Sequence, residues 1–247
     1  MTSPIDPVIE VAGIRKRFGP VTAVDGVSFT VGAGEVFGVV GSNGAGKTTT
    51  LECILGLRRP DAGTVRVLGL DPAVQGEQLR LRVGAQLQAA QLPPRLKVRE
   101  ALIWFASFYP RTQDPDALLQ RWGLEARRSA AVGDLSGGER QRLFIALALL
   151  HEPEIVCFDE LTTGLDPRAR RETWRAVEAL RAGGRSVLVV THDMEEAERL
   201  CDRVAVFDGG RIVALGRPAD LVDEIGADSL EDLFLARTGR HTEVDVR

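Results

Sequence analysis

Residues 41–48 read GSNGAGKT, which fits the phosphate-binding pattern G-x-x-x-x-G-K-[ST]. In such a loop the backbone N–H groups cradle phosphates, and the helix that begins there adds a partial positive charge. We expect Lys47 to contact the β- and γ-phosphates of a nucleotide and Thr48 to hold Mg²⁺. A bare glycine turn is the alternative, but the apolar strand expected before the loop and the helix after it favour phosphate binding. The predicted phosphate-binding residues are Gly41, Ser42, Asn43, Gly44, Ala45, Gly46, Lys47, Thr48 and Thr49.

A second glycine-containing turn, LSGGERQR, begins at Leu135. Ser136 and Glu139 have the spacing of a capping box, so a helix should start here. An ordinary capped helix is the bland alternative, yet it would not require two consecutive glycines, which weaken a helix. Gly137 and Gly138 leave the backbone bare for close approach to an anion at the helix N-terminus. We therefore interpret Ser136, Gly137 and Gly138 as nucleotide contacts.

Two carboxylates end the apolar segment EIVCFDE at residues 154–160. A phosphate-loop enzyme needs a carboxylate for its metal at the end of such a strand, which predicts a magnesium role for Asp159. Glu160 follows it and can orient and polarise the attacking water. Two acids could also simply begin a loop, but downstream of both glycine motifs they indicate nucleotide hydrolysis.

The elements that must position these residues follow from hydrophobic periodicity. Residues 8–31 alternate between apolar and polar positions, as in a half-buried antiparallel sheet. The run EVFGVVG predicts a buried strand that leads into the phosphate loop, and KTTTLECILGL predicts a helix stopped by Pro60. Further strands are expected at 64–69 and 81–87.

The second half of the chain predicts parallel strands with crossover helices. Helical periodicity and proline punctuation mark 89–150 as an inserted helical subdomain. Short β-branched runs at 155–158 and 186–191 flank an expected helix over 167–182. Residues 203–216 read as a hairpin, and 217–247 as a polar, partly helical tail.

Composition narrows the class of protein. The chain has 247 residues and a formal net charge of −4, which argues against a nucleic-acid binder. Three scattered cysteines are expected to be buried and reduced. The apolar stretch LFIALALL is too short to cross a bilayer and no apolar leader opens the chain, so we expect a cytoplasmic protein.

These motifs, in this order, make the chain resemble the ATP-binding cassette (ABC) family over nearly its whole length. The resemblance implies an α/β fold: a P-loop NTPase with a RecA-like core, an N-terminal antiparallel β subdomain and an inserted helical subdomain. The ATPase domain would span 8–216, with the helical insertion at about 89–150 and the tail at 217–247. ATP and Mg²⁺ are the implied cofactors.

The resemblance assigns further residues by position. Gln88 resembles the family's magnesium- and water-contacting glutamine, although Gln86 and Gln91 stand nearby. Asp166, in GLDP, resembles the aspartate that communicates across a dimer, and it should also cap the next helix. His192 resembles the histidine that contacts the γ-phosphate, and Phe18 the aromatic that stacks on adenine.

Some residues receive other interpretations. His151 and His241 match no such position and are expected to be solvated, whereas Asp193 is expected to cap a helix in a D-x-x-E box. The chain has Leu161 where relatives commonly have proline, which could loosen how Glu160 is held and reduce turnover modestly.

The implied function is ATP hydrolysis by a head-to-tail pair of such subunits, which drives a separate membrane permease from the cytoplasmic face. The segments VGAQLQAAQLPPRLKVREAL and SLEDLFLARTG resemble the daunorubicin and multidrug exporter branch in particular. A soluble non-transport ATPase, such as an iron–sulfur cluster assembly ATPase, stays open as the alternative. A module that binds ATP without hydrolysing it is disfavoured, because Lys47, Asp159, Glu160 and His192 are all present.

Overall fold

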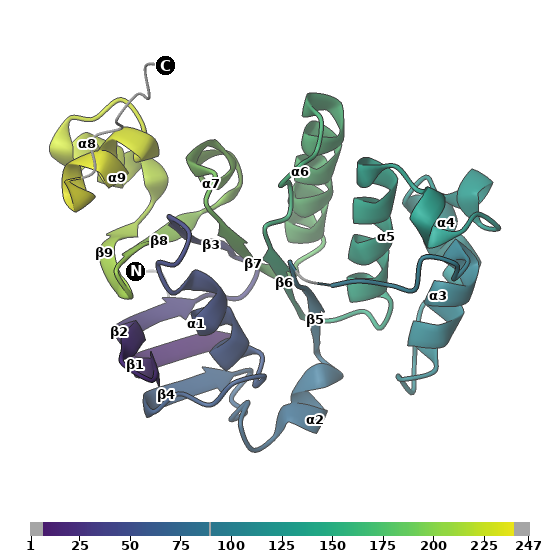
Figure 1. The fold of residues 1–247 in the computed structure, drawn as a ribbon, viewed down its shortest axis with the longest axis horizontal. Helices are drawn as coiled ribbons and strands as arrows, with labels where there is room; N and C mark the ends of the chain where they lie inside the picture. The colour runs from purple at the N-terminus through teal and green to yellow at the C-terminus, as the bar shows by residue number, and fades with distance from the viewer. Residues whose placement is uncertain (1–6, 89, 240–247) are drawn as a thin grey trace.

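A computed structural model describes residues 7–88 and 90–239 of the chain. It contains a six-stranded sheet and a smaller three-stranded sheet, with helices packed around them (Figure 1). The large sheet has the order β5-β6-β7-β3-β8-β9, and all of its strands are parallel except the edge strand β9. This confirms the predicted α/β arrangement. The strands are β3 (Val36–Gly41), β5 (Val83–Gln86), β6 (Ile155–Asp159), β7 (Ser186–Thr191), β8 (Arg203–Asp208) and β9 (Arg211–Gly216).

The N-terminal sheet is antiparallel, as the alternating pattern predicted. It pairs β2 (Val21–Val31), β1 (Ile9–Phe18) and β4 (Ala62–Val67) in that order. Its apolar face packs towards the large sheet, where the Phe29 and Phe37 rings stack with centroids 5.0 Å apart. The beginning of β2 lies close to the loop that follows β3, where the Ala23 carbonyl oxygen faces Gly46.

Helix α1 (Lys47–Ile54) starts directly after the phosphate loop and packs between the two sheets. It is shorter than predicted, because it ends before Gly56 and not at Pro60. Gly56 has φ +69°, a left-handed conformation that suits glycine after a helix C-terminus. A Cβ at this position would lie 2.4 Å from the Pro72 carbonyl oxygen, so a residue with a side chain would not fit here.

The opposite face of the large sheet carries four helices: α6 (Pro167–Ala182), α7 (Met194–Leu200), α8 (Pro218–Ile225) and α9 (Leu230–Thr238). The predicted helix over 167–182 matches α6, and the predicted hairpin matches β8 and β9. In the tail, Leu230, Leu233 and Phe234 are buried in this core, so its described part packs on the domain. The predicted tail residues 240–247 lie outside the described residues.

The helical segment lies beyond the β5 edge of the large sheet (Figure 1). It comprises α3 (Val98–Ala106), α4 (Pro115–Arg121) and α5 (Gly137–Leu149), and the short helix α2 (Gly76–Arg80) precedes β5. These helices have an apolar core of their own, which includes Leu102, Leu118 and Leu143. Another face of α5, with Ile145, Ala148 and Leu149, contributes to the core under the large sheet, so this helix connects the two parts.

The three cysteines are buried as the sequence predicted, whereas His151 is not exposed to solvent as expected. Cys53, Cys157 and Cys201 are free and buried, as predicted, and burial raises the pKa of Cys53 to about 11 and that of Cys157 to about 12. The expectation for His151 was wrong. Its ring is buried and stacks on Tyr109 with centroids 4.1 Å apart, and burial lowers its pKa. His241 lies outside the described residues.

Candidate active site

The phosphate loop runs from the end of β3 to the start of α1, as the sequence predicted. Gly41 has φ +149° and Gly46 has φ +98°. A Cβ at these positions would lie 2.2 Å from the Phe207 carbonyl oxygen and 2.3 Å from the Ala23 carbonyl oxygen, respectively. Only glycine fits both the backbone angles and this close approach of neighbouring strands.

Lys47 is held inside this loop. Its side chain is buried, and Nζ donates to the carbonyl oxygens of Gly41 at 2.7 Å and Ser42 at 3.0 Å. Burial lowers the pKa of Lys47, while the nearby charges of Glu160 and Asp159 act in the opposite direction. The ammonium group is therefore placed within the cradle that the loop forms.

The other predicted loop residues divide by exposure. Asn43, Gly44 and Thr48 are exposed, and Ser42 and Thr49 are half-buried, whereas Ala45 and Gly46 are buried against β2 and the turn between β8 and β9. The exposed positions line the outer side of the loop, where a phosphate could approach.

Asp159, the last residue of β6, is the most buried acid of the site, with 1% of its surface exposed. Burial, with the Glu160 charge, raises its pKa to about 6, against opposing contributions from the Gln88 backbone, Lys47 and Thr48. Thr48 Oγ1 lies 3.5 Å from Oδ2, and Oδ1 accepts no hydrogen bond from the described residues.

This arrangement fits a magnesium ion. Mg²⁺ is usually held by one or two carboxylates together with the phosphates of a nucleotide, so a large cluster of protein ligands is not needed. A buried carboxylate oxygen without a donor, next to the Thr48 hydroxyl, is what such an ion would satisfy.

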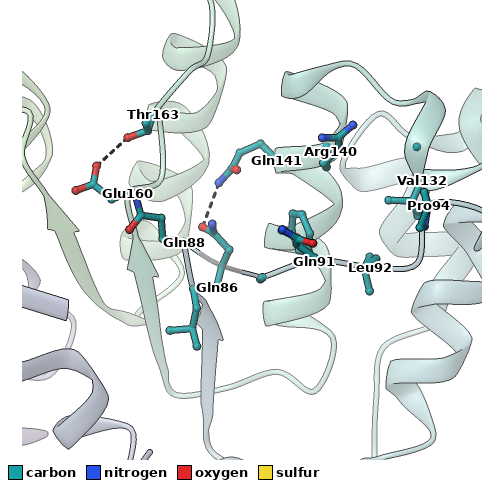
Figure 2. Close-up of a pocket in the computed structure, with 14 residues that line it drawn as sticks. Gln86, Gln88, Gln91, Leu92, Pro94, Val132, Arg140, Gln141, Glu160 and Thr163 are labelled. Atoms are coloured by element: carbon teal, nitrogen blue, oxygen red, sulfur yellow. Dashed lines mark hydrogen bonds between the residues drawn. The ribbon is translucent and has the colours of Figure 1, made fainter. Parts of the chain in front are cut away.

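Glu160 adopts a left-handed backbone conformation, φ +57°, immediately after β6. Its N–H donates to the Val190 carbonyl oxygen at 2.8 Å, which ties it to the neighbouring strand β7. Its Oε2 accepts a hydrogen bond from Thr163 Oγ1 at 2.8 Å and lies 2.6 Å from His192 Nδ1 (Figure 2 shows the Thr163 contact). The fold thus brings the predicted water-orienting and γ-phosphate residues into contact, although they lie 32 positions apart.

Gln88 lies on the segment that follows β5, beside Glu160. Both residues line a cavity of about 530 Å³ (Figure 2). Its side chain is exposed. The neighbouring candidates behave differently: Gln86 is buried and its Oε1 accepts from Gln141 Nε2 at 3.1 Å, whereas Gln91 lines the wall farther from Glu160. The geometry therefore favours Gln88 among the three glutamines.

The turn before α5 has the predicted capping box. Ser136 Oγ accepts from the Glu139 N–H at 3.3 Å, and Glu139 Oε2 accepts from the Ser136 N–H at 2.9 Å. A hydrogen bond from Arg127 is the main reason why the pKa of Glu139 falls to about 2. Ser136 and Gly137 are exposed, and a Cβ on Gly138 would meet Ala169 of α6 at 3.0 Å.

Asp166 and Phe18 complete the predicted residues. Asp166 caps α6 by accepting from the N–H groups of Arg168 at 2.9 Å and Ala169 at 3.0 Å, as predicted, and it lines a cavity of about 450 Å³ together with Ser136. Phe18 ends β1 with 41% of its surface exposed, so it is not a core residue. The Arg58 guanidinium lies 4.8 Å from its ring centroid.

Two features differ from the sequence-based expectations. Asp193 caps α7, but Glu196 does not complete the predicted box; Thr191 Oγ1 accepts from the Asp193 N–H instead, and the Glu196 carboxylate turns into the core. Leu161, at the position where relatives commonly have proline, is fully buried in the core below the large sheet, so packing holds this position. Thr163 was not predicted at all, because a lone threonine in a loop carries no sequence signal.

Comparison with known proteins agrees with this geometry. The ABC transporter family profile matches residues 24–163. The chain is 44% identical over 232 residues to the Nod factor export ATP-binding protein I of Ralstonia nicotianae, covering 91% of this chain and 72% of that protein. It is 42% identical over 229 residues to the protein of the same name from Rhizobium etli, covering 90% of this chain and 72% of that one.

Solved structures give the same result. The structure of an ATP-binding subunit of an ABC transporter superposes with a TM-score of 0.84 at 30% identity, covering 94% of this chain and 99% of that one. A nucleotide-free ATP-binding cassette has a TM-score of 0.80 at 23% identity, over 92% of this chain and 98% of that one, and supports the fold alone. Within the described ranges, no helix combines the length and apolar character needed to cross a bilayer. The chain belongs to the ABC transporter family, in which it is an ATP-binding subunit with ATPase activity.

Proposed function

We propose that two copies of this chain close head to tail around two ATP molecules, and that hydrolysis powers export through a separate permease. Within one copy, the loop at residues 41–49, with Lys47, holds the phosphates, and Phe18 stacks on the adenine. The exposed ring of Phe18 at the end of β1 supports the stacking role. The ATPase domain is assigned to 8–216, with the helical insertion at about 89–150 and the tail at 217–247.

Asp159, Thr48 and Gln88 are the residues assigned to Mg²⁺. When bound, the ion would neutralise charge on the phosphate oxygens. The buried Oδ1 of Asp159 and its neighbour Thr48 support the assignment, and the exposed Gln88 amide faces the same side as Glu160.

Glu160 is assigned to orient and polarise the attacking water, with His192 contacting the γ-phosphate. Thr163 and His192 both contact Oε2, so the carboxylate is held at one oxygen while the other is assigned to the water. Phosphoryl transfer depends on positioning and charge stabilisation, which such a fixed carboxylate provides.

The second copy would supply Ser136, Gly137 and Gly138 to the γ-phosphate, and Asp166 would communicate across the pair. The exposed capped turn before α5 supports this role, because its N–H donors lie at the surface. Loss of the γ-phosphate would remove the contacts that favour the closed pair, and the pair would open.

Export is proposed from the relatives, whose names describe Nod factor export. The sequence also resembles the daunorubicin and multidrug branch, so both similarities indicate an exporter. We place the subunit in the cytoplasm, on the cytoplasmic face of the membrane through its permease, with no role in nucleic-acid binding.

The observation that carries the proposal is the 2.6 Å contact between Glu160 and His192 beside the buried Asp159. Glu160→Gln keeps the side-chain shape but removes the charge, so we expect ATP turnover to fall by at least about 100-fold. The ATP-bound pair should accumulate, measured by light scattering after size-exclusion chromatography.

Glu154→Gln is the matched control, since Glu154 precedes the same strand and, among the described residues, its carboxylate pairs with Arg82 at the surface. It should keep its turnover. Unchanged turnover in Glu160→Gln, or a rate per molecule that does not depend on dilution in a preparation that stays monomeric, would contradict the proposal.

A further inference from the structure

Phe18 carries an exposed ring that no apolar core supports. It is the last residue of β1, and Gly19 after it has φ +55° in the turn that leads to β2. Among the described residues, Phe18 belongs to none of the three apolar clusters. A ring at a strand end has more than one staggered rotamer open to it, so a stacking surface at this position needs another support.

A cation from the segment after α1 lies over this ring. Arg58 follows α1 on the way to β4, and its guanidinium carbon lies 4.8 Å from the Phe18 ring centroid. At this distance a cation is attracted to the face of an aromatic ring. Lys16 Nζ lies farther away, at 6.0 Å from the same centroid, and is paired with Asp61 at 2.6 Å. Arg58 is therefore the nearer of the two cations.

Glu52, near the end of α1, fixes Arg58 through both side chain and backbone. Its carboxylate accepts hydrogen bonds from Arg58 Nε at 2.6 Å and from Nη2 at 3.3 Å. The Arg58 N–H also donates to the Glu52 carbonyl oxygen at 3.1 Å. A pair with two such hydrogen bonds sets the plane of the guanidinium as well as its position. The cation is thereby held in place over one face of Phe18.

We propose that Arg58 is a positioning residue for the base of ATP: held by Glu52, it covers one face of Phe18 and leaves the opposite face to the adenine. It acts through the ring and does not touch the nucleotide. Because α1 also begins at Lys47, one helix then fixes both the phosphate end and the base end of the site. The inference rests on the proposed stacking role of Phe18. A ring that is already held loses less conformational freedom when a base stacks on it, which favours binding.

The test measures the binding of two probes by isothermal titration calorimetry without Mg²⁺, so that ATP is bound and not hydrolysed. ATP carries a base, whereas inorganic tripolyphosphate offers the phosphates alone. Arg58→Met keeps an apolar stem and removes the guanidinium, so we expect the Kd for ATP to rise about three-fold. The Kd for tripolyphosphate should stay at the wild-type value, because the phosphate loop is not altered.

Arg59→Met is the matched control, because Arg59 is the exposed neighbour and its substitution makes the same change in net charge. It should leave both Kd values unchanged. Equal losses of ATP binding in the Arg58 and Arg59 variants would be an effect of net charge and would overturn the inference. Wild-type ATP affinity in Arg58→Met, or an equal loss with tripolyphosphate, also overturns it. So does tighter ATP binding, since the guanidinium would then occupy the place of the adenine.

Phe18→Leu serves as the reference in the same assay. Loss of base stacking predicts a rise of at least about five-fold in its Kd for ATP. Arg58→Met should add nothing in the Phe18→Leu background, and a further loss there would mean that Arg58 does not act through the ring. If Phe18→Leu keeps wild-type affinity, the proposed stacking role fails and the inference falls with it. If it loses affinity while Arg58→Met does not, only the inference fails.

Discussion

The two halves of the proposed nucleotide site differ in how they hold their polar groups. In the phosphate-loop half, Lys47, Asp159 and Glu160 are all buried. Lys47 donates to the Gly41 carbonyl oxygen, and Glu160 contacts His192. In the half at the start of α5, Ser136 and Gly137 are exposed, and the local cap uses only the N–H and hydroxyl of Ser136. The first half carries charges that burial makes costly, while the second offers donors at the surface to another molecule. Variants of the two halves should therefore differ in their effects on ATP binding, stability and turnover.

The largest effect is expected at Lys47. Lys47→Met removes the buried ammonium group that would reach the phosphates, so we expect the Kd for ATP to rise about 100-fold. Burial lowers the pKa of Lys47, so the nucleotide-free variant should be as stable as wild type or more so. Equilibrium binding of a fluorescent ATP analogue and thermal melts measure both quantities.

Lys97→Met is the control for this variant, because Lys97 is an exposed lysine at the start of α3. It should leave both the Kd and the melting temperature unchanged. A Lys47→Met protein that binds ATP normally would show that the loop does not hold the phosphates as proposed.

Asp159 gives a pH-dependent effect on stability. Its pKa is raised to about 6, mainly by burial, so folding disfavours the carboxylate. This cost is present above pH 6 and disappears as the pH falls through 6 towards the ordinary value near 4. The nucleotide-free Asp159→Asn variant should therefore exceed wild type in free energy of unfolding by about 3 kcal/mol at pH 8.

Urea unfolding at pH 5, 6, 7 and 8 measures this difference for the two proteins. The advantage of the variant should stay nearly constant between pH 8 and 7, and then shrink through pH 6 to pH 5. A difference that is constant with pH would mean that Asp159 is not the group that titrates.

The smallest effect is expected from removing the serine side chains that cap two helices. Ser136 caps α5 and Ser229 caps α9, and each accepts a hydrogen bond from the N–H three residues on, at 3.3 and 3.1 Å. Ser136→Ala and Ser229→Ala should each lower the free energy of unfolding by about 1 kcal/mol. Only Ser136→Ala should also lower ATP turnover, by about ten-fold, because its hydroxyl is assigned to the partner's γ-phosphate.

Chemical denaturation and steady-state turnover give both readouts for each variant. Equal turnover in the two proteins would reduce Ser136 to a helix cap. A loss in Ser229→Ala would mean that the tail helix α9 contributes to activity.

Motifs that are local in the chain were read correctly from the sequence. The loop from Gly41 to Lys47, the box of Ser136 with Glu139, and the Asp166 cap each depend on residues within eight positions of one another. Their hydrogen bonds are dictated by backbone geometry at a helix start, so residue type and spacing suffice.

Features that depend on distant segments were missed or misread. The ring of His151 is buried against Tyr109, which lies in the segment between α3 and α4. The Glu196 side chain left its predicted cap because Trp174 offered a partner in the core. None of these partners is visible in the local pattern.

The sequence by itself determined the α/β order of elements and the residue types available to phosphate, metal and water, because those follow from periodicity and short-range caps. The contact of Glu160 with His192, the raised pKa of Asp159 and the placement of Glu196 were decided only by tertiary structure. The physical reason is that strands β6 and β7 are neighbours in the sheet, so their ends meet at one edge. Burial at that edge then sets the charges and the partners of each side chain.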